Sequence, residues 1–222
     1  MKRGVIVVAG GRGLRMGGDL PKQFIPVHGK PVLMHTLAVF HRWDAHAALV
    51  VVLPETHRAY WEMLCRELNC RIPHVVVTGG ETRFHSVVNA LPYVSSCDIT
   101  GVHDGVRPLV MPDVIETCFT CAVQYGAAVP AVPLTESIRV RDEAGSHAVD
   151  RAAYCVVQTP QVFRSDWLRE AYRRPYTSSF TDDASVVEAA GKTITLVTGN
   201  RENIKMTTPL DLAVMERLLT AE

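Results

Sequence analysis

The sequence lacks any apolar run long enough to cross a bilayer, and it has no excess of charge of either sign. Its 222 residues contain 23 Lys and Arg against 23 Asp and Glu, so the formal net charge at pH 7 is zero. A balanced charge argues against a broad surface for nucleic acid or membranes, although a local basic pocket is still compatible with it. The first residues, MKRGVIVVAGG, pass from a short apolar run straight into glycines, unlike a signal peptide. We therefore expect a cytoplasmic protein that binds neither nucleic acid nor membranes.

The cysteines lack the pattern of a zinc site. Of the six, only Cys118 and Cys121 have C-x-x-C spacing, and no second C-x-x-C or pair of histidines accompanies them. They fall in PDVIETCFTCAVQYG, which predicts a helix. We interpret the cysteines as reduced thiols that pack as small apolar side chains.

Short β-branched runs instead alternate with amphipathic runs along the whole chain. Unbroken apolar segments such as GVIVVA (4–9) and ALVVVLP (48–54) predict strands buried on both faces. Runs such as PVLMHTLAVFHRW (31–43) predict helices. This alternation predicts an α/β fold with a mostly parallel, Rossmann-like sheet and helices on both faces. The length is compatible with a single domain over residues 1–222.

One segment, ESIRVRDEAGSHAVDRAAYCVV (136–157), departs from the alternation. Polar and apolar residues alternate on either side of DEAG, a turn sequence, which predicts a protruding antiparallel β-hairpin. A lone hairpin is only marginally stable in water. We therefore predict a dimerisation arm that leaves the domain and packs on another subunit. A hairpin folded back onto its own domain is the alternative.

The loop from Gly10 to Lys22 follows the first predicted strand. Ligands of parallel α/β folds bind at the carboxyl ends of strands, which is where this loop lies. Its glycines allow backbone N–H groups to approach an anion, and Arg12, Arg15 and Lys22 add positive charge. The loop therefore predicts a polyphosphate site.

The sequence of the loop from Gly10 to Lys22 excludes two common types of phosphate-binding loop. No G-x-x-x-x-G-K-[ST] string occurs in the chain. The dinucleotide fingerprint G-x-G-x-x-G fails because Met16 stands in its third glycine position, which argues against a nicotinamide-dependent oxidoreductase. A third pattern, G-x-G-x-R-M followed by P-K, is complete. Its residues are Gly11, Gly13, Arg15, Met16, Pro21 and Lys22.

With this pattern the sequence resembles the nucleotidyltransferases that join a nucleoside triphosphate to a sugar or polyol phosphate. PKQF (21–24) narrows the resemblance to the cytidylyltransferases for small polyol phosphates. Further stretches that resemble this family, in the same order and over nearly the whole chain, are GGETRFHSV (79–87), VHDGVRP (102–108), VPLTESI (132–138), VDR (149–151), QTPQVF (158–163), TDDAS (181–185) and ENIKMTTPLDL (202–212).

The resemblance implies transfer of a cytidylyl group from CTP to 2-C-methyl-D-erythritol 4-phosphate, with release of pyrophosphate, in non-mevalonate isoprenoid biosynthesis. Ribitol 5-phosphate is the alternative acceptor, because AGG (9–11) and HDGVRP (103–108) differ from the family's commoner AA-G and HDAARP. A non-catalytic nucleotide-binding protein that uses the arm as its interface is a further alternative.

The implied nucleophile, a phosphate oxygen, is already anionic. Catalysis should therefore depend on cations and alignment rather than on a strong base. The resemblance implies that Arg15 and Lys22 stabilise the transition state, and that Arg151 and Lys205 hold the attacking phosphate. It also implies that the arm crosses to the partner subunit of a homodimer and helps to build its site.

The remaining implied roles concern CTP, the metal and the acceptor. Asp104, at the end of the fourth predicted strand, is expected close to an Mg²⁺ ion held mostly by phosphates and water. The residues implied for CTP are Ala9, Gly10, Gly11, Gly13 and Asp104, with Gly80, Glu81 and Ser86 as the cytosine pocket. Those implied for the acceptor are Arg107, Thr135, Thr159 and Thr181.

Overall fold

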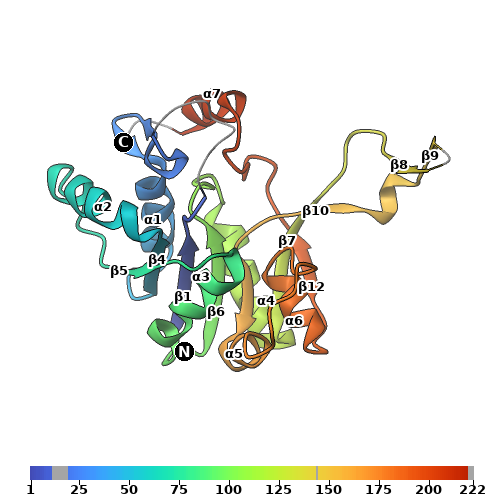
Figure 1. Ribbon diagram of the computed structural model, residues 1–222, viewed down its shortest axis with the longest axis horizontal. Coiled ribbons are helices and arrows are strands. Elements are labelled where there is room, and N and C mark those ends of the chain that lie inside the picture. Colours follow the sequence, from blue (N-terminus) through green and yellow to red (C-terminus); the bar gives the residue numbers. More distant parts are fainter. Residues whose placement is uncertain (12–19, 144, 220–222) are drawn as a thin grey trace.

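An eight-stranded sheet forms the centre of the protein (Figure 1). The computed structural model describes residues 1–11, 20–143 and 145–219. The strands run in the order β10-β7-β11-β6-β1-β4-β5, and β12 also pairs with β7. They are β1 (Arg3–Val8), β4 (Ala48–Leu53), β5 (Val75–Thr78), β6 (Ile99–Asp104), β7 (Ala127–Pro133), β10 (Cys155–Val157), β11 (Gln161–Arg164) and β12 (Thr195–Thr198).

Parallel pairing dominates the half of the sheet that precedes the arm in sequence. Strand β1 pairs in parallel with both β4 and β6, and β4 pairs in parallel with β5. Strand β7 pairs in parallel with β12, whereas β10 and β11 join the sheet antiparallel to their neighbours. The carboxyl ends of β1, β4, β5 and β6 consequently meet at one edge, as the parallel α/β prediction requires.

The helices pack on both faces of this sheet. Within β1, Val5 and Val7 join the core under α1, α2 and α4, while Ile6 joins the core under α3, α5 and α6. This is why the central strands are unbroken apolar runs rather than alternating ones. The helices are α1 (Val32–Trp43), α2 (Glu55–Glu67), α3 (Arg83–Ala90), α4 (Pro112–Tyr125), α5 (Ser165–Ala171), α6 (Asp183–Ala189) and α7 (Pro209–Leu218).

Local sequence signals fix several helix ends. Helix α4 begins with Pro112 and ends at Gly126, whose φ of 93° lies in the left-handed region. A Cβ at Gly126 would lie 2.2 Å from the Trp167 ring, so only glycine fits there. Helix α6 begins with a capping box made by Asp182 and Ser185. No helix in the described ranges is long and apolar enough to cross a membrane.

The predicted hairpin leaves the sheet and projects away from it (Figure 1). Strands β8 (Arg139–Asp142) and β9 (Gly145–Ala148) pair antiparallel, and all of their residues are exposed. The hairpin is shorter than the predicted segment, because β10, at its end, pairs with β7 in the main sheet. The role of the arm in dimerisation stays a prediction.

Candidate active site

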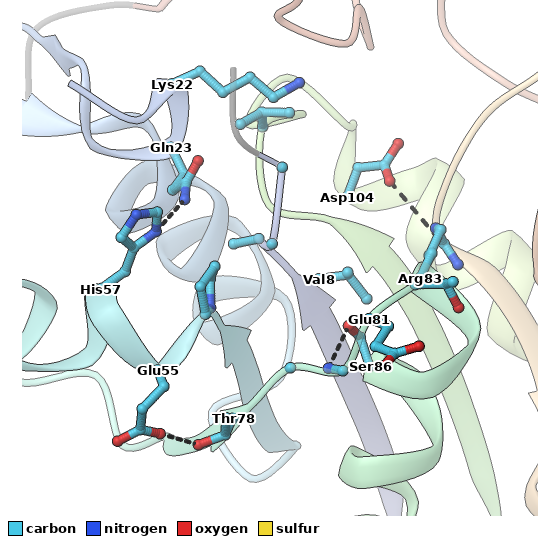
Figure 2. Close-up of a pocket in the computed structure, with 18 of the residues that line it drawn as sticks. Val8, Lys22, Gln23, Glu55, His57, Thr78, Glu81, Arg83, Ser86 and Asp104 are labelled. Atoms are coloured by element: carbon cyan, nitrogen blue, oxygen red, sulfur yellow. Dashed lines mark hydrogen bonds and ion pairs between the residues drawn. The ribbon is translucent and has the colours of Figure 1, made fainter. Parts of the chain in front are cut away.

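A cavity of about 570 Å³ opens at the edge where the parallel strands end (Figure 2). Its walls come from the ends of β1, β4, β5 and β6, from the segment around Lys22, and from the loop that carries Lys205. The described residues predicted for CTP, together with Lys22 and Lys205, all line it: Ala9, Gly10, Gly11, Lys22, Gly80, Glu81, Ser86, Asp104 and Lys205. The other two residues predicted from the first loop, Gly13 and Arg15, lie outside the described residues.

The loop between β5 and α3 is held in a fixed shape. The N–H of Gly79 donates to the Leu53 carbonyl at 2.8 Å, and the N–H of Gly80 donates to Oγ of Ser86 at 3.1 Å. A Cβ at Gly80 would lie only 2.4 Å from Cβ of His85, so the loop depends on glycine at this position. Ser86 thus has a structural role in shaping the cavity wall.

Asp104 is surrounded by three cations at the end of β6. Its Oδ2 lies 3.0 Å from Nε of Arg107 and 3.0 Å from Nζ of Lys205, and its Oδ1 lies 3.7 Å from Nη2 of Arg83. The Asp104 side chain is only 9% exposed. Burial by itself raises the pKa of this carboxyl, but Arg83, Lys205 and Arg107 together hold the pKa well below its usual range. Asp104 is therefore a carboxylate at neutral pH.

A chain of hydrogen bonds on the side away from the cavity holds the backbone of Asp104 in place. The Asp104 N–H donates to Oγ1 of Thr159 at 3.1 Å, and Thr159 contacts Nδ1 of His103 at 3.0 Å. Nε2 of His103 lies 3.0 Å from the Arg107 carbonyl, which can only accept, so this nitrogen carries the proton. Burial lowers the pKa of His103 to about 4, so the ring is neutral. Thr159, predicted for the acceptor, lies buried behind Asp104.

Lys22 and Lys205 reach the cavity from opposite ends of the chain. Nζ of Lys22 donates to the Met206 carbonyl at 3.2 Å, across a separation of 184 residues. The Met206 N–H in turn donates to the Val106 carbonyl at 3.1 Å, just after β6. Lys22, Lys205 and Asp104 all line the same cavity, and Nζ of Lys205 lies 3.0 Å from Oδ2 of Asp104.

A second cavity, of about 370 Å³, shares Lys205 as a wall and lies at the base of the arm. Arg107 and Thr135, both predicted for the acceptor, line it as well. Arg151 lines neither cavity of the single chain, and its Nη1 donates to the Thr135 carbonyl. Thr181 is exposed just before α6, where its N–H donates to Oγ of Ser185, and it also lines neither cavity.

The residues of the cavity offer little to a metal ion on their own. Among the described residues, no group of three or more His, Cys, Asp or Glu side chains is arranged to hold one. Asp104 is a carboxylate on the cavity wall, which suits Mg²⁺, but its oxygens already face cations. An Mg²⁺ ion here fits only if phosphate oxygens supply most of its ligands.

Sequence reasoning missed one wall of the cavity. This wall is formed by the four residues that directly follow β4, namely Pro54, Glu55, Thr56 and His57. Gln23 also lines the cavity, and its Nε2 lies 3.3 Å from Nδ1 of His57. The position of these residues after a predicted parallel strand was the available signal, since such loops meet at one edge.

Comparisons with known proteins identify the family of the chain. The model of the IspD family, 2-C-methyl-D-erythritol 4-phosphate cytidylyltransferase, matches residues 4–221. A relative with that name from Bacteroides thetaiotaomicron is 53% identical over 99% of this chain and 100% of its own length. The relative with that name from Porphyromonas gingivalis is 54% identical over 99% of both chains. The crystal structure of the Thermus thermophilus protein of that name is 32% identical, with a TM-score of 0.79 over 98% of both chains. The resemblance and the fold class predicted from the sequence are confirmed, and the chain belongs to the IspD family of cytidylyltransferases.

Proposed function

We propose that this protein transfers the cytidylyl group from CTP to 2-C-methyl-D-erythritol 4-phosphate. The products are 4-diphosphocytidyl-2-C-methyl-D-erythritol and pyrophosphate, and the enzyme acts in cytoplasmic isoprenoid biosynthesis. The observation that carries the proposal is the convergence of Gly10, Gly80, Asp104, Lys22 and Lys205 on one cavity, from stretches far apart in the sequence.

The nucleotide lies with its base on the loop between β5 and α3. The backbone of Gly80 and Glu81 and the hydroxyl of Ser86 are fixed polar groups, as the recognition of one base over another requires. The triphosphate extends from there along the glycines after β1 toward Lys22. That lysine is a compact charge suited to single phosphate oxygens, and Arg15 adds a planar fork that binds two oxygens.

The chemical step is an attack by the acceptor's phosphate oxygen on the α-phosphorus of CTP, with pyrophosphate as the leaving group. The attacking group needs no base, so the protein has to overcome charge repulsion and align the reactants. Lys22 and Arg15 stabilise the negative charge that develops on the transferred phosphate. Lys205 lies where the two cavities meet, and it holds the attacking phosphate beside the nucleotide.

Asp104 would hold a divalent cation, Mg²⁺, together with oxygens of the triphosphate. When bound, it supplies charge neutralisation at the phosphates. The cations around Asp104 keep its carboxyl ionised, so an oxygen ligand is available at neutral pH. Lys205 pairs with this carboxylate at 3.0 Å, and the phosphate of the acceptor would offer Lys205 an alternative anionic partner.

The acceptor binds in the second cavity, where Arg107, Thr135 and Lys205 come together. Arg151 lies on the exposed base of the arm and lines neither cavity of its own chain. We assign it to the site of the partner subunit in a homodimer, with the arm crossing over.

Turnover with defined acceptors tests the proposed reaction. The enzyme is supplied with CTP, Mg²⁺ and either 2-C-methyl-D-erythritol 4-phosphate or ribitol 5-phosphate, and pyrophosphate is measured. We expect pyrophosphate release with the methylerythritol phosphate. Turnover with ribitol 5-phosphate alone would move the protein to the alternative function, and NADH binding in place of CTP binding would exclude both.

Mixed dimers test the shared site. Lys22→Ala and Arg151→Ala are each expected to be nearly inactive alone. If Arg151 acts across the dimer, mixing the two restores about a quarter of wild-type activity, because half the dimers are mixed and each of these has one intact site. No recovery after subunit exchange, or full activity of a monomer in light scattering, would contradict the shared site.

A further inference from the structure

Arg83, the first residue of α3, joins the cavity to a buried carboxylate behind it. The guanidinium lines the cavity, and its Nη2 lies 3.7 Å from Oδ1 of Asp104 (Figure 2). Its other terminal nitrogen, Nη1, donates to both oxygens of Asp183. The Arg83 side chain is 28% exposed, whereas that of Asp183 is completely buried. The buried Asp183 carboxylate thus fixes one end of the Arg83 guanidinium, while the Arg83 side chain still lines the cavity.

Tyr172 completes the attachment. Its hydroxyl donates to Oδ1 of Asp183 at 2.6 Å, and its ring stacks on Phe84, the residue after Arg83, with 4.7 Å between the centroids. Burial and the nearby Asp183 carboxylate raise the pKa of Tyr172 well above its usual value, so the hydroxyl keeps its proton and donates. Tyr172 therefore supports both Arg83 and the start of α3.

Asp183 lies at a helix start that is hydrogen-bonded to the central sheet. It is the first residue of α6, whose capping residue Asp182 accepts from Nε2 of Gln161 at 2.7 Å. Oε1 of Gln161 accepts from the Ala184 N–H at 2.8 Å. Since Gln161 belongs to β11, the carboxylate that holds Arg83 is fixed to the central sheet.

Stability alone does not account for such a pair. A buried ion pair generally gives no more stability than well-packed apolar residues of similar size, whereas breaking one is costly. The Asp183–Arg83 pair lies at the point where α6, the loop after β5 and the end of β6 meet. Its position beside the cavity indicates a role in fixing the groups that line it.

We propose that Asp183 and Tyr172 are positioning residues for CTP binding, which act by holding Arg83. This inference rests on the proposed function, because it assigns the cavity to CTP. Without the Asp183 charge, Arg83 would be drawn onto Asp104, its other anionic neighbour, and would compete there with Arg107 and Lys205. The loop that follows β5 would also lose its attachment. Nucleotide affinity would fall although neither Asp183 nor Tyr172 lines the cavity.

Calorimetric titration of CTP into four proteins tests this: wild type, Asp183→Asn, Arg83→Met and the double variant. Each single change is expected to weaken CTP binding about 10-fold or more, the scale of one charge-assisted hydrogen bond. The double variant should bind no more weakly than Arg83→Met, because Asp183 acts through Arg83. Additive losses would overturn the proposal.

Further variants separate positioning from folding. Tyr172→Phe keeps the packing and should weaken CTP binding about 3-fold, with no effect once Arg83 is replaced. Asp166→Asn breaks a similar pair with Arg164 on the exposed surface and should leave CTP binding unchanged. In steady-state assays, Asp183→Asn should raise KM for CTP and leave KM for the polyol phosphate within about twofold.

An equal rise in both KM values, or unaltered CTP affinity in a folded Asp183→Asn protein, would refute the inference. Wild-type turnover is measured in parallel with the methylerythritol phosphate. If wild type binds CTP and the coupling holds but turnover is missing, the proposed reaction fails and the positioning role stands.

Discussion

Replacement of Asp104 by asparagine removes the charge on which three cations converge. The least exposed of them, Arg107, is 13% exposed, and its Nε lies 3.0 Å from Oδ2 of Asp104. Loss of this charge-assisted bond is worth about 1.5–3 kcal/mol of unfolding free energy. Lys205, 42% exposed, can return to water, so its pair adds only about 0–1 kcal/mol. Arg83 lies farther away and keeps Asp183.

The sum of the two pairs predicts that Asp104→Asn lowers the free energy of unfolding by about 1.5–4 kcal/mol at pH 7. For a chain of this size the midpoint of thermal unfolding should fall by roughly 3–16 °C. The matched control is Asp166→Asn, whose pair with Arg164 is exposed on both sides and should be worth less than about 1 kcal/mol. Urea unfolding followed by circular dichroism gives both values.

The effect should depend on pH in one direction. The folded pKa of Asp104 lies below its unfolded value, so its stabilisation is complete above the unfolded pKa of about 3.9 and is lost as pH falls further. The difference between wild type and Asp104→Asn should be constant from pH 8 to pH 5 and smaller by about 1 kcal/mol at pH 3. A loss at pH 7 no larger than that of Asp166→Asn, or a difference that grows on acidification, would refute this account of Asp104.

Three shorter predictions concern the reaction. Lys22→Ala should lower kcat by about 100-fold or more, the scale of a lost transition-state donor, while Lys2→Ala, an exposed lysine elsewhere, should not change it in a pyrophosphate-release assay. Gly80→Ala places a Cβ 2.4 Å from that of His85, so the loop must shift, and KM for CTP should rise about 10-fold or more with kcat less affected. Chelation with EDTA should abolish turnover, and added Mg²⁺ should restore it; full activity in EDTA would remove the cation from the mechanism.

Local sequence patterns predicted the α/β architecture, and the family resemblance named several residues that line the cavity at the ends of the parallel strands. The apolar runs that became β1 and β4 report burial on both faces, which occurs where helices cover a parallel sheet. The loop at Gly10 and Gly11 was predicted at the carboxyl edge, and both glycines line the cavity. These features could be predicted from the sequence because they depend on neighbouring residues and on the geometry of parallel strands.

Contacts between residues that are far apart in the sequence could not be predicted from local patterns. Nothing near Lys22 in sequence indicates its contact with Met206, and nothing near Arg83 indicates its pair with Asp183, 100 residues away. Strand direction was also open, since the alternation of apolar and amphipathic runs predicts a mostly parallel sheet but not that β11 lies antiparallel to β6.

The sequence by itself determined the α/β class and the family, because both depend on short local patterns of apolar residues, glycines and cations. Phosphate binding by the first loop stays a prediction from the same patterns. Only the tertiary structure decided which cation pairs with which carboxylate in and behind the cavity. Asp104 meets Arg83, Arg107 and Lys205, and Asp183 holds Arg83 from behind, because packing brings β6, α3, α6 and the loop before α7 together. Ion pairs depend on distances of a few ångströms between such elements, and no local pattern encodes those distances.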